Sequence, residues 1–347
     1  MSEPVGDLPA FLALSAENQR EAYLAGAAEL GRPAIVLEKD VWVCWVLEAL
    51  FSCPDIPDMA FKGGTSLSKI FSAISRFSED IDVTVDHSGL VPGLDPYDPT
   101  STGGQKKRDN DTLLKALLDC SNGVIVPHLR GSLEAAGLSA GDLVVGEGGT
   151  ELTVQYPHLV RDGASYYREG VKIEFGGRNM IDPNQQHVVT PYMAELLDNF
   201  TFPAGRVDVL APERTFWEKF TLAHAESNRQ PMVTGDRISR HWHDLAVLAD
   251  HQIGQAALAD MPLLEDVVKV KERFFRRASS QYDRCLAGES CLLPGDEGLA
   301  LLRADYEEML SAEMLDNPMT FDEIIERVKA LEADANRAIT AARLTGQ

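Results

Sequence analysis

The spacing of apolar residues predicts alternating helices and strands in the N-terminal part of the chain. Helices repeat apolar residues every three or four positions, whereas strands repeat them every second position. By these patterns the chain contains, in order, helices at 15–30 and 38–51, a strand at 59–61, a helix at 65–75 and a strand at 80–85. Thr65 is placed to cap the third of these helices with its hydroxyl.

Further along the chain, helices and strands continue to about residue 210, and after it the pattern is mostly helical. Residues 88–111 are rich in Gly, Pro, Ser and Asp and predict a long loop or insertion. After this segment we expect a helix at 111–137, strands at 150–157, 168–176 and 206–210, of which the first two pair, and then helices with loops near 227–236 and 286–297. Pro212 suits the first position of the first of these C-terminal helices. We therefore place an α/β domain over residues 1–210 and a helical domain over 211–347.

The composition is that of a globular protein, with 44% hydrophobic and 25% charged residues. No apolar run approaches the roughly 20 residues of a membrane span, and the N-terminus lacks the features of a signal peptide. Five scattered cysteines without a C-x-x-C pair indicate neither a disulfide framework nor a zinc knuckle. These features predict a cytoplasmic protein with no membrane partner.

The formal charge of -22 argues against a broad electrostatic surface for nucleic acid, because such binding depends on Lys and Arg meeting phosphates. The charge is uneven, however. Acidic residues dominate after residue 290, whereas Lys, Arg and His gather in residues 62–76, 168–178 and 206–243. A local basic site is therefore compatible with a surface that is otherwise acidic and solvated.

The first candidate site residues are the carboxylates of "DIDVT", Asp80 and Asp82. On a strand they point the same way, with Ile81 packed behind them. Two neighbouring carboxylates repel each other, and a bound cation relieves that cost. Mg²⁺ favours a few carboxylates, water and substrate phosphates. An exposed acidic pair at the end of a strand would show the same pattern.

A glycine pair, Gly63 and Gly64, precedes these aspartates. Glycine lets backbone approach a ligand closely, and free N–H groups at a helix start attract anions. Thr65 and Ser66 add hydroxyl donors. A simple strand-to-helix turn explains this motif taken alone. Together with the aspartates on the next element, it indicates a site for a metal ion and a triphosphate.

The strand "VKIEF" provides two further candidates, Lys172 and Glu174, which share its polar face. If this strand neighbours residues 80–85, Glu174 supplies a third carboxylate and Lys172 a charge partner or phosphate contact. A cross-strand ion pair on a solvated face is the alternative interpretation.

The helical part carries two more candidates. Lys219 lies on a helical face with Thr215 and Leu222, and Asp244 follows Arg240 at the spacing of an ion pair. A solvated lysine and a surface ion pair explain both without any function. The histidines of "RHWHDL" are two residues apart, so they diverge on a helix, and a zinc site is not indicated.

As a set, the segments "EKDVWV", "FKGGTSLSKIF", "RFSEDIDVTV", "YYREGVKIEFGGR", "VLAPERTFWEKFTLAHAE" and "SRHWHDLAVL" resemble the AbiEii/AbiGii toxin family over residues 36–250. These are nucleotidyltransferase-like toxins of bacterial abortive-infection and toxin–antitoxin systems, and they include the mycobacterial MenT toxins. The resemblance implies an α/β (α+β) fold, a DNA polymerase β-like core with a mostly helical C-terminal region. Many members have Gly-Gly-Ser where this chain has Gly-Gly-Thr, which keeps the hydroxyl.

The resemblance also implies roles for particular residues. It places nucleotide binding at Lys62, Gly63, Gly64, Thr65, Ser66, Arg76, Ser78 and Lys219. It places Mg²⁺, as a two-metal site, at Asp80, Asp82 and Glu174. The implied catalytic set is Asp80, Asp82, Glu174, Lys172, Lys219 and Asp244. No family motif falls after about residue 260.

The implied reaction is Mg²⁺-dependent transfer of a nucleotide from an NTP to an acceptor, which inhibits translation and growth. The resemblance suggests an RNA acceptor such as a tRNA 3′ end, and an antitoxin encoded by a neighbouring gene. A basic rim of Arg168, Arg178, Arg206 and Arg240 would meet the RNA, although the charge of -22 opposes this. Glycan, small-molecule and protein acceptors stay open.

Three other functions share parts of this pattern. D-x-D-x-T also opens haloacid dehalogenase-type phosphatases, but the preceding "RFSE" is too polar for their buried strand. Sugar-nucleotide glycosyltransferases use D-x-D, but they do not explain the glycine pair. A module that binds NTP or RNA without turnover is the third, and the intact Asp80, Asp82 and Glu174 argue against it.

Overall fold

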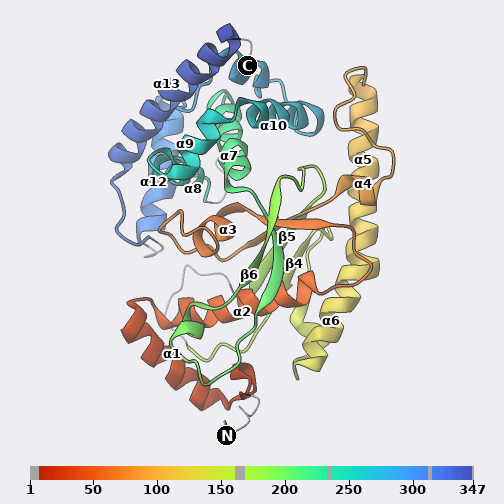
Figure 1. Ribbon diagram of the computed structural model, residues 1–347, viewed down its shortest axis with the longest axis vertical. Helices are drawn as coiled ribbons and strands as arrows, with labels where there is room; N and C mark the ends of the chain where they lie inside the picture. The colour runs from red at the N-terminus through yellow and green to blue at the C-terminus, as the bar shows by residue number, and fades with distance from the viewer. Residues whose placement is uncertain (1–7, 161–168, 233–236, 312–314, 346–347) are drawn as a thin grey trace, which may run out of the picture.

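The computed structural model describes residues 8–160, 169–232, 237–311 and 315–345 (Figure 1). Seven strands form one mixed sheet with the order β3-β4-β5-β2-β1-β7-β6. The strands are β1 (Met59–Lys62), β2 (Ile81–Val85), β3 (Leu143–Val145), β4 (Glu151–Val154), β5 (Val171–Gly176), β6 (Asn184–Val189) and β7 (Gly205–Leu210). The predicted α/β class is therefore confirmed.

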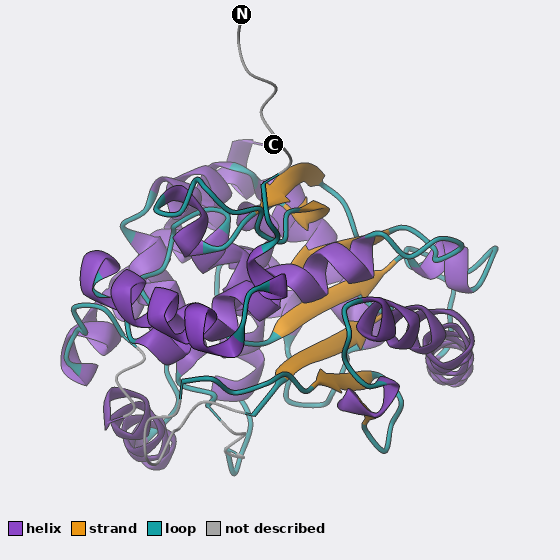
Figure 2. Cartoon of the chain, turned by 90° about the horizontal axis from the view of Figure 1, so that it is seen from below, coloured by secondary structure: helices purple, strands orange, loops and turns teal. Residues whose placement is uncertain are grey.

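Helices lie on both sides of this sheet, as the view in Figure 2 shows. Those before β7 are α1 (Ala16–Leu30), α2 (Ala34–Phe51), α3 (Gly63–Lys69), α4 (His87–Leu90), α5 (Gly103–Cys120) and α6 (Val126–Ala135). Those after it are α7 (Pro212–Ser227), α8 (Arg240–Ala249), α9 (Gln252–Ala259), α10 (Met261–Phe274), α11 (Tyr282–Ala287), α12 (Asp296–Ser311) and α13 (Phe321–Thr345). None of these helices is long and apolar enough to cross a membrane.

The register of the central strands aligns three predicted site residues. β1 pairs antiparallel with β2, which sets Lys62 opposite Asp82. β2 pairs parallel with β5, which sets Asp82 opposite Glu174. Residues opposite one another on adjacent strands have side chains about 5 Å apart at Cβ. The sheet therefore carries Lys62, Asp82 and Glu174 in one row, and the condition under which Glu174 would join the two aspartates as a third carboxylate is met.

Two apolar cores hold this arrangement together. One packs α2 against the sheet, and α2 is buried on nearly every face because α1 and α6 also contact it. The other joins α7–α13 and takes in Leu67, Ala73 and Ile74 from the segment after β1. This second core fixes the C-terminal helices over the glycine turn, above the sheet in Figure 1. The domain boundary near residue 210 stays a prediction.

Several predicted boundaries were wrong. The helix predicted at 65–75 begins at Gly63 and ends at Lys69, so Thr65 lies inside it and Lys62 precedes it without a side-chain cap. The loop predicted at 88–111 is shorter, because α4 ends at Leu90 and α5 begins at Gly103, where Thr102 caps it. Glycine-rich composition hid this helix start. The strands β3 and β6 were not predicted; β3 has only three residues, and the only apolar residues of β6 are the two valines at its end.

The other predicted elements are confirmed with small shifts. The helix expected at 111–137 is α5 and α6, joined by a π-helical turn over Ser121–Ile125. The strands at 150–157 and 168–176 are β4 and β5, which pair antiparallel. Pro212 opens α7 as expected.

Candidate active site

A cavity of about 280 Å³ lies where the central strands meet the C-terminal helices. Its walls come from the β1–α3 turn, β2, β5, α7, α8 and α10. The lining residues are Lys62, Gly63, Gly64, Arg76, Ser78, Asp82, Glu174, Asn179, Thr215, Glu218, Lys219, Leu222, Arg240, His241, Lys271 and Phe275. Residues from both halves of the chain thus meet in one pocket that mixes cations and carboxylates.

The glycine turn is shaped by its neighbours. Gly63 has a φ of 83°, and a Cβ there would lie 2.2 Å from Oδ2 of Asp82. A Cβ on Gly64 would lie 2.3 Å from Nη2 of Arg76 and 2.9 Å from Oγ of Ser78. Both positions therefore admit only glycine without displacement of a charged side chain. The turn brings backbone to the floor of the cavity, beside Asp82.

Replacing Gly63 by alanine is expected to abolish most activity, because the new methyl group must displace the Asp82 carboxylate. Gly31 is the matched control: its φ is 62° and nothing lies within 4 Å of a Cβ there. Both alanines bear the strain of a positive φ, about 1–2 kcal/mol. Urea unfolding should therefore show that this strain lowers the free energy of unfolding of both variants. Only Gly63→Ala should also lose activity. Equal activity of the two variants would contradict this role for the turn.

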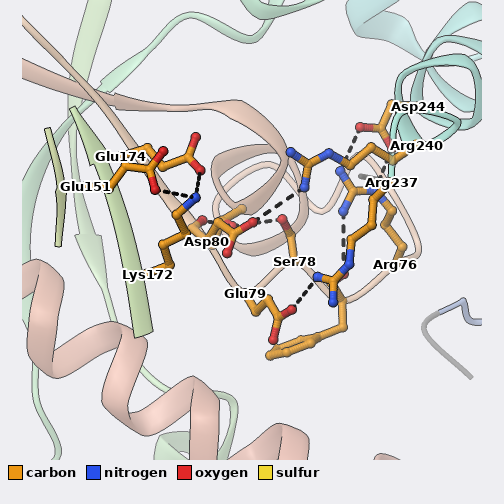
Figure 3. A network of polar contacts seen from close by, with 12 residues as sticks. Arg76, Ser78, Glu79, Asp80, Glu151, Lys172, Glu174, Arg237, Arg240 and Asp244 are labelled. Carbon is orange, nitrogen blue, oxygen red and sulfur yellow. Dashed lines mark hydrogen bonds and ion pairs between the residues drawn. The ribbon is translucent and has the colours of Figure 1, made fainter. Parts of the chain in front are cut away.

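Asp82 on β2 and Glu174 on β5 are neighbours on adjacent strands. Lys172 binds both Glu174 and Glu151, with its Nζ 3.1 Å from Oε2 of Glu151 (Figure 3). Lys172 does not line the cavity, and this ion-pair network is the role that the structure shows for it. Its amine holds the Glu174 carboxylate at the edge of the pocket, beside Asp82.

Asp80 lies just before β2 and is only 6% exposed. Its Oδ2 is 3.5 Å from Nη1 of Arg240, and its Oδ1 has no hydrogen-bond partner among the described residues. It lines a small neighbouring cavity of about 10 Å³ together with Arg76, Ser78 and Arg240, which also line the larger pocket. A buried carboxylate oxygen without a partner is costly unless a ligand satisfies it.

Asp82 is partly buried between opposing charges. Burial raises its pKa, and Glu174 and Asp80 add to this, while Lys62 and Arg240 act in the other direction. Its environment therefore disfavours the ionised carboxylate when nothing is bound. A cation near Asp80 and Asp82 would reverse this balance and satisfy the free oxygen of Asp80. These two residues fit a magnesium ion.

The structure does not gather all three predicted metal ligands into one group. Within residues 8–160, 169–232, 237–311 and 315–345, no cluster of three or more His, Cys, Asp or Glu side chains converges as a metal site. Glu174 instead forms its ion pair with Lys172. Its role as a ligand stays a prediction.

A buried ion network lies behind the pocket. Arg76 donates two hydrogen bonds to Asp244, at 2.7 and 2.8 Å, and Nζ of Lys219 lies 2.9 Å from the same carboxylate. Burial alone would raise the pKa of Asp244, but Arg76 and Lys219 hold it well below its usual range. Asp244 is fully buried, so it positions the two cations that line the cavity. It does not pair with Arg240, as the spacing had suggested.

The segment before β2 is held by a second buried network that the sequence did not reveal. Glu79 is 2% exposed and lies 2.5 Å from both Nζ of Lys39 on α2 and Nη1 of Arg237. These two anchors, which appear in part in Figure 3, fix the residue next to Asp80. Asp80, just before β2, is therefore held in place by its neighbour, although one of its own carboxylate oxygens has no partner among the described residues.

Among the lining residues that were not predicted, Glu218 and Lys271 carry charge, and both lie in ordinary helical patterns. Glu218 accepts a hydrogen bond from Lys62 at 3.0 Å. Burial would raise the pKa of Glu218, but the nearby cations Lys62 and Lys271 lower it. Burial lowers the pKa of Lys271 to about 8, against the pull of Glu218. The only sign in the sequence that Glu218 belongs to the site is its position next to Lys219, a predicted site residue. Nothing in the sequence marked Lys271.

Some predicted residues do not line the cavity. Thr65 and Ser66 are buried, and their hydroxyls donate to the backbone oxygens of Asp80 and Gly63, respectively. Arg206, predicted on the basic rim, is the second residue of β7, whereas the site lies beyond the other end of that strand. Arg168 lies outside the described residues. Lys219, Arg76 and Ser78 do line the cavity.

Comparison with known proteins identifies the family of this chain. The sequence profile of the nucleotidyl transferase AbiEii toxin family, from type IV toxin–antitoxin systems, matches residues 45–327. A search of curated proteins found no match. Among solved structures, the nucleotidyltransferase toxin MenT4 of Mycobacterium tuberculosis aligns with a TM-score of 0.45 and 18% identity over 94% of each chain. The profile spans most of the chain and includes every residue that lines the cavity, so this protein belongs to the AbiEii family of nucleotidyltransferase toxins.

Proposed function

We propose that this nucleotidyltransferase uses Mg²⁺ and an NTP to add a nucleotide to the 3′ end of an RNA, with tRNA as the acceptor. The observation that carries the proposal is the cavity that Lys62, Asp82 and Glu174 of the sheet line together with Lys219 of α7. Carboxylates that suit a cation thus adjoin amines that suit a triphosphate, and the glycine turn leaves room beside them.

The cations of the pocket would bind the triphosphate. Lys62 is paired with Glu218 and Lys219 with Asp244, so both amines are held in fixed positions before the substrate arrives. Arg240 is 3.5 Å from Asp80 and could exchange this weak contact for a phosphate oxygen. Donors held in place stabilise the charge that develops on the leaving pyrophosphate.

Glu174 would orient the attacking hydroxyl. Its carboxylate is fixed by Lys172 and stands opposite Asp82 in the sheet. The hydroxyl oxygen forms a bond to the α-phosphorus, the bond from that phosphorus to the bridging β-oxygen breaks, and pyrophosphate leaves. The hydroxyl proton passes to the Glu174 carboxylate or through it to water.

Asp80 and Asp82 would hold the metal, as the free oxygen of Asp80 and the raised pKa of Asp82 indicate. The chemistry that Mg²⁺ supplies when bound is neutralisation of phosphate charge and activation of the bound oxygen. Transfer to tRNA would block translation in the cytoplasm, and an antitoxin encoded nearby would restrain it.

The proposal is tested by incubating the protein with Mg²⁺, total tRNA and each α-labelled NTP in turn. Label in RNA with one NTP, lost in the Asp80→Asn/Asp82→Asn variant, is the expected result. Labelled protein without labelled RNA would show a protein acceptor instead. NTP binding without any transfer, retained in the double variant, would show a binding module.

Lys271 gives the reaction a pH dependence. Its pKa of about 8 means that its positive charge is present below pH 8 and is lost above it. We therefore expect the KM for NTP to rise as the pH passes from 7 to 9, and to do so less in Lys271→Gln. Lys269→Gln, which removes an exposed lysine of the same helix, should keep the normal profile. The same pH profile in all three proteins would exclude this role.

A further inference from the structure

A second and larger cavity, of about 550 Å³, adjoins the candidate active site. It lies between α5, the end of β5 and the C-terminal end of α10, and α5 contacts α10 directly. Consecutive residues line the two cavities: Arg178 belongs to the second and Asn179 to the first, and likewise Phe274 and Phe275. Figure 1 shows α5 standing beside the sheet on the side of α10.

The charge of this cavity is opposite to that of the whole chain. Its basic lining residues are Lys106, Lys107, Arg178, Arg273 and Arg276, and Asp111 is the one carboxylate among them. Lys106, Lys107 and Arg178 have no ion pair with any described residue, whereas the chain carries a formal charge of -22. Cations gathered in a cleft without partners attract an anionic ligand.

Buried polar atoms in the same cavity also lack partners. Arg273 is 5% exposed, and only its Nη2 is bonded, to Asp109. Its Nε and Nη1, and Oδ1 of the neighbouring Asn110, have no hydrogen-bond partner among the described residues. A buried guanidinium with free donors is costly unless a ligand or water accepts from it.

The remaining lining is apolar. Leu113, Leu117 and Phe274 form a buried floor, and Leu114 is 51% exposed on the same helix. Arg178 lies over the ring of Phe275 with its guanidinium carbon 4.5 Å from the centroid, which links this lining to the wall of the first pocket. An apolar floor with a basic rim suits a nucleotide, whose base takes the apolar contacts and whose phosphate takes the cations.

We propose that this cleft binds the last unpaired nucleotides of the acceptor RNA and delivers their 3′ hydroxyl to the first cavity. The inference rests on the proposed transferase function. The base packs against this apolar floor, and the phosphates meet Lys106, Lys107 and Arg178. Because the rest of the surface is acidic, the footprint is short: a single-stranded end enters the cleft, while a duplex body is repelled.

The test uses direct binding without NTP, so that turnover is not needed. A fluorescein-labelled single-stranded RNA with the sequence of a tRNA 3′ end is titrated with the full-length protein, and anisotropy is followed at several salt concentrations. With three phosphate contacts, log Kd should depend on log salt with a slope of about 2. In Lys106→Ala/Lys107→Ala the slope should fall to about 0.7 and the Kd should rise about tenfold.

The matched control is Lys115→Ala/Lys329→Ala, which removes the same charge from α5 and α13 at two positions that do not line the cavity. It should bind the RNA as the parent protein does. A blunt duplex of the same sequence should bind far more weakly. Equal losses in the two variants, equal binding of the duplex, or competitive displacement of the RNA by ATP would each overturn the proposal, the last because it would show one shared nucleotide site.

Kinetics separate this inference from the function on which it rests. If transfer occurs, Lys106→Ala/Lys107→Ala should raise the KM for RNA and leave the KM for NTP unchanged. If the variant transfers nucleotides with an unchanged KM for RNA, the proposed role of the cleft is wrong and the transferase function stands. RNA binding that depends on the cleft lysines, without transfer from any NTP, would keep the cleft and reject the proposed reaction.

Discussion

The Asp82→Asn variant is expected to lose at least about a thousandfold in nucleotide transfer and yet to remain as stable as the parent protein. Asparagine keeps the size of the side chain but removes the charge that a cation needs. Burial raises the pKa of Asp82, and the nearby Glu174 and Asp80 add to this, so the ionised carboxylate is not favoured in the folded protein. Its removal should therefore cost no stability at neutral pH.

Asp86→Asn is the control for this variant. Asp86 follows the far end of the same strand and caps α4, and asparagine caps helices equally well. It should keep both activity and the urea midpoint. An Asp82→Asn protein that retains transfer would remove Asp82 from the site. One that loses transfer and unfolds more easily would show that the residue is structural.

The Asp244→Ala variant is expected to lose about 3–5 kcal/mol of unfolding free energy, together with its activity. Asp244 is fully buried between Arg76 and Lys219, which are 5% and 7% exposed. Removal of the shared carboxylate leaves two buried cations without their partner. Urea unfolding at neutral pH measures the loss.

The pH dependence and a matched variant check the cause. Because Arg76 and Lys219 hold its folded-state pKa low despite burial, Asp244 stabilises the protein above its unfolded pKa of about 3.9. That contribution disappears as the pH falls through the folded value. The difference between parent and variant should therefore shrink in acid. Asp250→Ala, which breaks an exposed pair with Arg327, should change stability by less than about 0.5 kcal/mol. Similar losses in both variants would contradict this account of Asp244.

The central part of the site could be predicted because it depends on local patterns. The strand period places Lys172 and Glu174 on one face, and the glycine pair before D-x-D marks the turn. These patterns did not show that β2 pairs with β5; the third carboxylate was conditional on that pairing, and the register of Asp82 with Glu174 meets the condition. Family resemblance added Lys219 and Asp244, whose positions on ordinary helices gave no such signal.

The remainder depends on contacts between distant segments. Glu79 looked like one acid among many, yet it is buried between Lys39 and Arg237, which lie 40 and 158 residues away. Lys271 joins the pocket only because α10 packs on α7. A periodicity shows which face of a helix is apolar, but not which buried cation that face meets.

The measurement that tests the central claim most directly is the fate of the two ends of the NTP. With the active NTP and tRNA, parallel reactions carry label on the α- or the γ-phosphate, and released pyrophosphate is counted. Nucleotidyl transfer predicts α-label in the RNA, no γ-label there, and one pyrophosphate for each nucleotide added. Label from the γ-phosphate on the acceptor would show phosphoryl transfer and contradict the account.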